Sequence, residues 1–231
     1  MRSRTPSTAS RMGFTLVELM VVIGIIVVLI AILMPLLGRA RDAAWAVKCQ
    51  SNMSQLARAS LLYAGENDSR LPRPNWVGKE NIAGWLYRAP INPVQSYVQT
   101  GVFWQYIHDE RIYRCPADSG PFETGPSRNL TSYLMNGAVI GYGNPTSESW
   151  RTHQMRPDGV MFWEADETGG AAWNDGSSYP WEGETQRHGN RGSCFACFDG
   201  HAEWWTHTEY VLQQNFLPGK LWCNPGNSNG Q

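Results

Sequence analysis

The chain has 231 residues, enough for one ordinary domain with an appendage or for two small ones. Its 19 basic and 20 acidic residues give a formal net charge of −1, which argues against a strongly basic nucleic-acid binder and against an acidic solvating tail. Hydrophobic residues make up 42% of the chain, so disorder over most of its length is excluded. Five cysteines are too few for a disulfide-built scaffold of this length.

The first 37 residues differ from the rest of the chain. Residues 1–13 contain three arginines and no acidic residue, whereas residues 14–37 are apolar with a single charge, Glu18. A helix of about 20 apolar residues can cross a bilayer, and its Arg-rich side is expected to stay in the cytoplasm. The pattern predicts a single-pass inner-membrane helix with the body of the chain outside the cytoplasm.

Three interpretations of this segment compete. A secretory signal peptide has a shorter apolar core and a small-x-small cleavage site after it, whereas this apolar run is long and passes into RARDAAWAVKCQ without a clean site. A plain single-span anchor would keep its N-terminus. Processing ahead of the apolar run is the third interpretation, and it accounts for the string GFTLVE at residues 13–18.

GFTLVE at the head of an apolar helix resembles the class III signal of type IV prepilins and type II secretion pseudopilins. The resemblance implies that a prepilin peptidase cuts between Gly13 and Phe14 and then N-methylates the new terminus. Glu18 matches the family's glutamate four residues after that terminus.

Glu18 and Pro35 are the candidate assembly residues of the apolar segment. A carboxylate near the end of a membrane helix is costly unless it is paired. The freed amine of a neighbouring subunit's Phe14 is a suitable partner, and this pair is expected to set the axial register of a filament. Pro35 lies where many pilins carry a helix-loosening proline, and we expect it to kink the helix.

Residues 38–64 predict an amphipathic continuation of the same helix, because apolar or small residues recur every three or four positions. Neither Pro nor Gly occurs between Arg39 and Ala64. We therefore expect one long helix from about Phe14 to Ala64, ended by Gly65-Glu66-Asn67-Asp68 with the glycine at the usual C-terminal position.

Beyond Ser69, frequent Pro and Gly predict short elements and long loops. Two short helices are expected, at 101–107 and 206–214. Strands are expected at 111–115, 132–135, 159–164, 192–198 and 202–206. Asp199-Gly200 between the last two strands indicates a tight hairpin with both turn residues at positive φ. Residues 168–184 are expected to form a loop, and residues 217–231 a loose tail.

The predicted fold class is α+β, pilin-like: a long N-terminal transmembrane or filament-core helix packed on a small antiparallel β-sheet with long irregular loops. The predicted organisation is a leader at 1–13, the transmembrane or filament-core helix at 14–37, its amphipathic continuation at 38–64, and a globular head at 65–231.

Later segments are similar to major-pseudopilin-like families that occur as many paralogues in some bacteria. KCQSNMSQLARASLLYAGENDSRLP resembles their post-membrane segment, and His188 followed by Asp199-Gly200 resembles their C-terminal His…Asp-Gly signature. That signature usually has nine residues between His and Asp, whereas this chain has ten, 189–198. The extra residue is expected to form a bulge or a longer loop.

The cysteines suggest one cross-link. Cys194 and Cys197 form a single CxxC on a predicted strand, where residues three apart point to opposite faces, so buried strand cysteines are the simpler interpretation. Disulfides form in export compartments, and we hypothesise a Cys49–Cys115 bond that joins the helix to the sheet. Cys223 is an alternative partner, and at least one of the five thiols must remain unpaired.

Candidate metal ligands gather near the predicted hairpin, where their simpler interpretation is as turn and strand-edge polar residues, so no metal or cofactor is expected. These candidates are His188, Asp199, His201 and His207, with Asp166, Glu167 or Glu203. Neither Gly-x-Ser-x-Gly nor His-Glu-x-x-His occurs. Glu164 with Asp166 or Glu167 could form a glycosidase-like pair, but carboxylates beside a strand end are usually solvated.

Eleven tryptophans complete the unusual features of the sequence. Packing in the core is the simpler explanation, because one Trp buries about 150–250 Å². The functional alternative is an exposed aromatic platform, chiefly Trp173 and Trp181.

Two functional hypotheses result. The first is a structural, non-enzymatic subunit of a type IV pilus or a type II secretion pseudopilus, assembled through its N-terminal helix into a filament at the periplasm or cell surface. The resemblance implies as partners other pilin or pseudopilin subunits, the prepilin peptidase, and the inner-membrane assembly platform with its ATPase. No nucleic-acid partner is expected. The alternative is a membrane-anchored extracytoplasmic binding module whose Trp-rich loops contact glycans or surface proteins.

Overall fold

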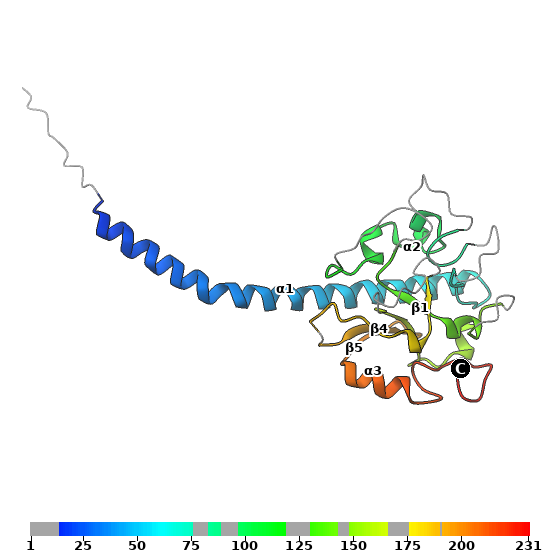
Figure 1. Ribbon diagram of the computed structural model, residues 1–231. Helices are drawn as coiled ribbons and strands as arrows, with labels where there is room; N and C mark the ends of the chain where they lie inside the picture. The colour runs from blue at the N-terminus through cyan, green and yellow to red at the C-terminus, as the bar shows by residue number, and fades with distance from the viewer. Residues whose placement is uncertain are drawn as a thin grey trace, which may run out of the picture. The chain divides into compact units, whose positions relative to one another are not determined.

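The computed structural model describes residues 14–75, 83–88, 97–118, 130–142, 148–165, 176–189 and 191–231 (Figure 1). The chain divides into two compact units, residues 1–41 and residues 42–231. Helix α1 runs through both units, and a five-stranded sheet lies within the second. The fold is α+β, as predicted.

Helix α1 spans Leu16–Glu66 and confirms the long predicted helix. The helix ends at Glu66, within the predicted stretch 65–68, but the expected glycine cap is wrong, because Gly65 lies inside the helix. The left-handed residues that follow the helix are Asp68 and Ser69, with φ of 51° and 61°. The side-chain amide of Asn67 donates to a carbonyl of the last turn at 2.8 Å, so polar side chains cap this end without a glycine.

The sheet has the strand order β3-β1-β2-β4-β5. The strands are β1 (Leu134–Asn136), β2 (Val160–Trp163), β3 (Ser177–Ser178), β4 (Ser193–Cys197) and β5 (Ala202–Trp205). Strands β1 and β3 pair in parallel and the other pairs are antiparallel. The predicted strands at 159–164, 192–198 and 202–206 are confirmed, and the one predicted at 132–135 lies slightly later, as β1.

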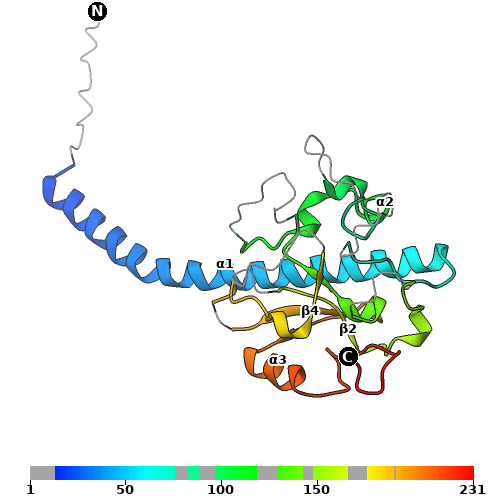
Figure 2. The ribbon, with the colours of Figure 1, turned by 45° about the vertical axis from the view of Figure 1, so that its right-hand side comes forward.

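Both faces of the sheet are covered, which explains the nearly continuous burial of β2 and β4. On one face, Met53 and Leu56 of α1 belong to the same apolar cluster as Phe162 of β2. On the other face, Phe195 of β4 packs with Tyr210 of helix α3 (His207–Gln214). Figures 1 and 2 show the later part of α1 and α3 on opposite sides of the sheet.

Strands β4 and β5 form the predicted hairpin, with Phe195 opposite Glu203. The expected two-residue turn is wrong. The Cys197 amide donates to the His201 carbonyl at 2.9 Å, so the loop is Phe198–Gly200. Only Gly200 in this loop has a positive φ, 92°. A three-residue loop with a left-handed glycine is the next commonest hairpin geometry.

The strand predicted at 111–115 is wrong, because Glu110–Tyr113 forms the 3-10 helix η2. The Asp109 carboxylate accepts a hydrogen bond from the Arg111 amide at 3.0 Å, which caps this turn and replaces an extended backbone. The predicted short helices are confirmed as α2 (Trp104–Ile107) and α3. The remaining 3-10 turns described are η1 (Tyr97–Thr100), η3 (Gly137–Ile140), η4 (Thr152–Gln154) and η6 (Pro180–Glu182).

The C-terminal segment 217–231 is not the loose tail that its sequence predicts. Leu221 and Trp222 are buried, and the Trp222 indole donates to the Gln214 carbonyl at 2.7 Å. In the predicted loop at 168–184, residues 168–175 lie outside the described residues, and the remainder contains β3 and η6.

Candidate functional site

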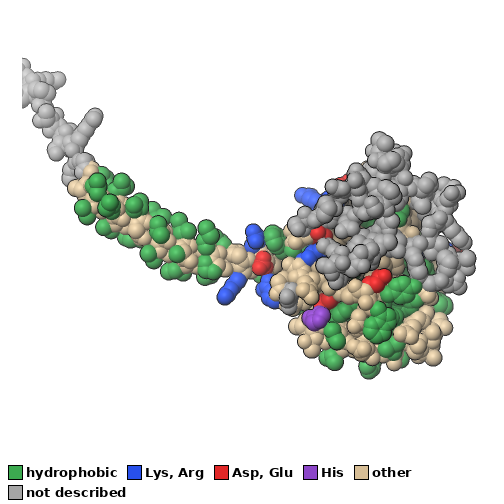
Figure 3. Space-filling model, viewed as in Figure 1, with side chains coloured by type: hydrophobic (Ala, Val, Ile, Leu, Met, Phe, Trp, Pro, Cys, Tyr) green, Lys and Arg blue, Asp and Glu red, His purple; other side chains and the backbone are tan. Residues whose placement is uncertain are grey.

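The N-terminal part of α1 is apolar around its whole circumference. No charged residue occurs between Leu19 and Leu37, and Figure 3 shows hydrophobic side chains over this segment. Among the described residues, α1 is the one helix long and apolar enough to cross a membrane, and none of its most apolar window is buried within the chain. A helix of this kind needs lipid or other apolar helices around it.

A reciprocal cap closes the first turn of α1. The Thr15 amide and hydroxyl donate to Glu18 Oε2 at 2.9 and 2.8 Å, and the Glu18 amide donates to Thr15 Oγ1 at 3.2 Å. This capping box follows from the Thr-x-x-Glu spacing at residues 15–18, a signal that the sequence reasoning missed. One carboxylate oxygen of Glu18 therefore has its hydrogen bonds within its own chain.

The other predicted processing and assembly residues flank this cap or follow it. Gly13 lies outside the described residues, and Phe14 is exposed just before α1. Pro35 lies inside α1, which remains helical on both sides of it. Cleavage before Phe14 and a kink at Pro35 stay predictions.

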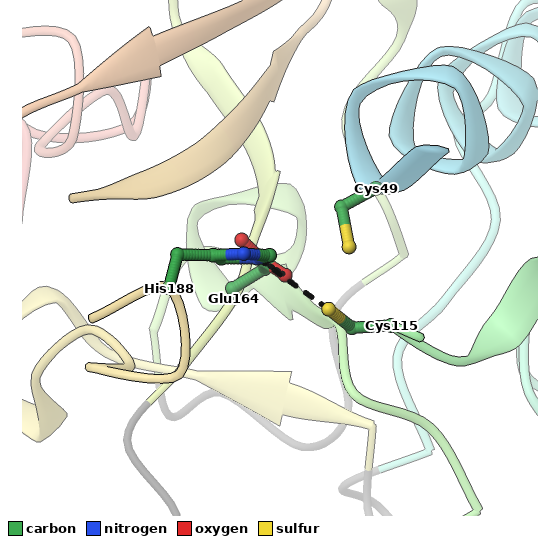
Figure 4. Close-up of side chains that lie close together, drawn as sticks. All are labelled: Cys49, Cys115, Glu164 and His188. Carbon is green, nitrogen blue, oxygen red and sulfur yellow. Dashed lines mark hydrogen bonds and ion pairs between the residues drawn. The ribbon is translucent and has the colours of Figure 1, made fainter. Parts of the chain in front are cut away.

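The second unit contains a buried group of metal-ligating side chains. Cys49 comes from α1, Cys115 follows η2, Glu164 follows β2, and His188 lies in the segment before β4. One donor atom of each lies within 4.8 Å of the others, and all four residues are buried (Figure 4). We call these four residues the buried cluster.

His188 Nε2 is at the centre of the contacts within the buried cluster. It lies 3.2 Å from Glu164 Oε1 and 3.5 Å from Cys115 Sγ. Burial opposes a charge on the imidazole, but its contacts with Cys115 and Glu164 outweigh burial and raise the pKa of His188 to about 9. Burial alone would raise the pKa of Glu164, yet the bonds from His188 and the Cys194 amide hold it below its ordinary value.

Neighbouring groups hold the cluster's side chains in place. The Cys194 amide donates to Glu164 Oε2 at 2.9 Å, which leaves Oε1 toward His188. Tyr133 lies beside Cys49, and its hydroxyl oxygen accepts a hydrogen bond from the side-chain amide of Asn52 at 3.3 Å. The Cys194 contact therefore fixes the carboxylate from outside the cluster.

All five cysteines are free thiols in this structure. The Cys49 and Cys115 sulfur atoms lie within 4.8 Å of each other, so their disulfide stays a prediction. Cys194 packs in the α1-side apolar cluster and Cys197 does not belong to it, in agreement with opposite faces of β4. Cys223 is buried near the Asn136 side chain, 3.6 Å from Nδ2.

The histidines and acids predicted near one hairpin lie in three separate places. His188 belongs to the buried cluster, whereas His201 pairs with Asp199 at the β4–β5 turn. His207 Nδ1 lies 2.9 Å from the Glu184 carboxylate. A small partly exposed group also forms from Cys197, His201 and Glu203. Asp166 and Glu167 lie outside the described residues.

The tryptophans mostly support the core-packing interpretation. Trp85 and Trp163 are fully buried and Trp205 is nearly so. Trp181 is 55% exposed and lies against the Trp222 ring. Trp173, the other residue of the predicted platform, lies outside the described residues.

Sequence reasoning treated the members of the buried cluster separately. It paired Cys49 with Cys115, placed His188 with the hairpin residues, and considered Glu164 only as a strand-end carboxylate. No short spacing joins the four, because they come from four different elements. The available signal was an acidic residue, Glu164, directly after the apolar run 160–163.

A scan against protein-family models, a search of curated proteins and a search of solved structures found no match to this chain. The chain itself shows a long apolar N-terminal helix whose later part packs on a small sheet, an arrangement of the pilin kind.

Proposed function

We propose that this chain is a structural subunit of a type IV pilus or a type II secretion pseudopilus, processed by a prepilin peptidase and without enzymatic activity of its own. One observation carries the proposal: an α-helix that is apolar on every side begins within the GFTLVE string, at Leu16. A plain membrane anchor needs an apolar helix of this length, but it does not need the GFTLVE string at the start of that helix.

Burial of the apolar helix is the proposed driving force for assembly. The segment is held in the inner membrane before assembly and packs among its copies afterwards, with the head outside the cytoplasm. Its exposed Leu, Ile and Val side chains each stabilise the buried state by about 1.5–3 kcal/mol relative to water, so the helix is not expected to leave lipid unless other helices replace it.

Glu18 is proposed to fix the register between subunits. Both hydrogen bonds that its carboxylate accepts from Thr15 use Oε2, and Oε1 has no hydrogen bond among the described residues. An ionised carboxylate has about four acceptor positions, so the methylated amine of a neighbouring subunit can bind without breaking the cap. The cap and the intersubunit pair therefore use different oxygens.

Filament isolation tests this function. Cells that produce the chain are sheared, and filaments are collected by centrifugation and probed for it. We expect the chain in the filament fraction, and its loss when the prepilin peptidase or the assembly ATPase is deleted. A chain that stays in the inner membrane in every strain, while a known pilin of the same cells is sheared off, would contradict the proposal.

A further inference from the structure

The buried cluster contains the full ligand set of a four-coordinate metal site. It offers two thiols, one imidazole and one carboxylate, with one donor atom of each within 4.8 Å of the others. The four residues are each no more than 2% exposed. Structural zinc sites are closed and tetrahedral, and use these ligand types.

The two distances from His188 Nε2 to its neighbours agree with the edges of a zinc tetrahedron. With bonds of about 2.3 Å to sulfur and about 2.0–2.2 Å to nitrogen and oxygen, the S···N edge is about 3.6 Å and the N···O edge about 3.4 Å. The observed distances from His188 Nε2 are 3.5 Å to Cys115 Sγ and 3.2 Å to Glu164 Oε1. A charge-assisted N–H···O bond is normally shorter, about 2.7–2.9 Å.

A hydrogen-bonded ion pair accounts less well for this arrangement. One ring nitrogen faces both the sulfur and the carboxylate oxygen, yet it has only one proton to donate. The second thiol, Cys49, points toward the same centre (Figure 4). A single cation bound by all four donor atoms explains why they converge.

We propose that the buried cluster binds one Zn²⁺ ion. Thiolate ligands favour zinc over calcium and magnesium, which prefer oxygen. The Cys194 amide orients the carboxylate from the second coordination shell, and the Tyr133 hydroxyl lies beside Cys49. The ion joins α1 to three segments of the head and so stabilises the packing of the head on the helix. It also excludes a Cys49–Cys115 disulfide in the same molecule.

Metal analysis of the full-length chain, purified in detergent from native membranes without chelators, tests this site. We expect close to one zinc per chain, and Cys49 and Cys115 protected from alkylation until a chelator is added. Replacement by Co²⁺ should give the visible bands of tetrahedral thiolate coordination. A chain that lacks metal, or that carries a Cys49–Cys115 disulfide as isolated, overturns the proposal.

Variants separate the site from general effects on folding. Cys115→Ala is expected to lose the zinc, whereas Cys223→Ala removes another buried thiol and should keep it. Tyr133→Phe retains the ring and removes only the hydroxyl beside Cys49, and we expect zinc affinity to fall about 10-fold. If Cys115→Ala does not fold, the cobalt spectrum of the wild-type protein and the zinc affinity of Tyr133→Phe still test whether the buried cluster binds the metal. Equal zinc content in Cys115→Ala and Cys223→Ala would overturn the assignment.

Discussion

Thr15 binds only one oxygen of Glu18. The amide and the hydroxyl of Thr15 both donate to Oε2, at 2.9 and 2.8 Å. The helix cap and the proposed intersubunit pair are therefore separable by mutation, because the cap needs an acceptor whereas the pair needs a charge.

Glu18→Gln is expected to retain the cap and lose assembly. Gln also closes a capping box, but it has no negative charge for a neighbouring amine. Thr15→Ala should weaken the helix start by about 1 kcal/mol and leave the carboxylate available. Quantifying the chain in sheared filaments compares the two variants, with membrane insertion as the control. Normal assembly of Glu18→Gln together with failure of Thr15→Ala would reverse these assignments.

Asn52 is expected to contribute strongly to the packing of α1 on the head. Its buried side-chain amide donates to the carbonyls of Arg111 and Arg114 at 3.2 and 3.0 Å. Asn52→Ala leaves both carbonyls without this donor, so we expect a loss of about 3 kcal/mol in unfolding free energy. Gln55→Ala, on the same helix, should change it by less than about 0.5 kcal/mol. Denaturation of both variants in detergent makes the comparison, and equal losses would refute the assigned contacts.

Gly192 and Gly189 form a matched pair at the approach to β4. Both have positive φ, 125° and 69°. A Cβ on Gly192 would overlap the Trp205 carbonyl, whereas a Cβ on Gly189 meets nothing within 4 Å. Gly189→Ala should cost about 1–2 kcal/mol of backbone strain, and Gly192→Ala more than about 4 kcal/mol. Thermal unfolding of the variants measures the difference, and similar melting temperatures would contradict it.

Glu184 is expected to make the folding stability of the protein depend on pH, in a direction that follows from its pKa. Burial raises its pKa above the ordinary 4.5, despite hydrogen bonds with Ser193 and His207. A carboxyl whose pKa is higher in the folded state favours folding most below its unfolded pKa, and that contribution is lost as the pH rises through the folded pKa. Glu184→Gln does not titrate.

We therefore expect the stability of Glu184→Gln relative to wild type to increase as the pH rises from 4.5 toward neutrality. Melting temperatures of both proteins across this range give the measurement. If the stability of Glu184→Gln relative to wild type falls as the pH rises, the expectation is contradicted, because the folded protein would then favour the ionised form of Glu184.

Local sequence signals were sufficient for much of the fold. The three-to-four residue spacing of apolar residues predicted the later part of α1, and the apolar runs on either side of Asp199-Gly200 predicted β4 and β5. The signals failed where a side chain redirected the backbone, as at the Asp109 cap of η2. Strand β3 is only two polar residues, and its parallel pairing with β1 depends on tertiary contacts.

The candidate site was only partly predictable for a different reason. Glu18 stands out as one charge in an apolar helix, so its sequence position alone marks it. The buried cluster depends on the convergence of four distant segments, and each member has an ordinary explanation when it is considered alone. Only the tertiary structure places the His188 ring between Glu164 and Cys115.

Prepilin processing of the chain is tested by the mass of its N-terminal peptide, taken from native membranes and measured by mass spectrometry. We expect a peptide that begins at N-methylated Phe14, because the proposed subunit must be processed before assembly. A peptide that begins at Met1 or Arg2, in cells with an active prepilin peptidase, would contradict the account and leave a plain membrane anchor.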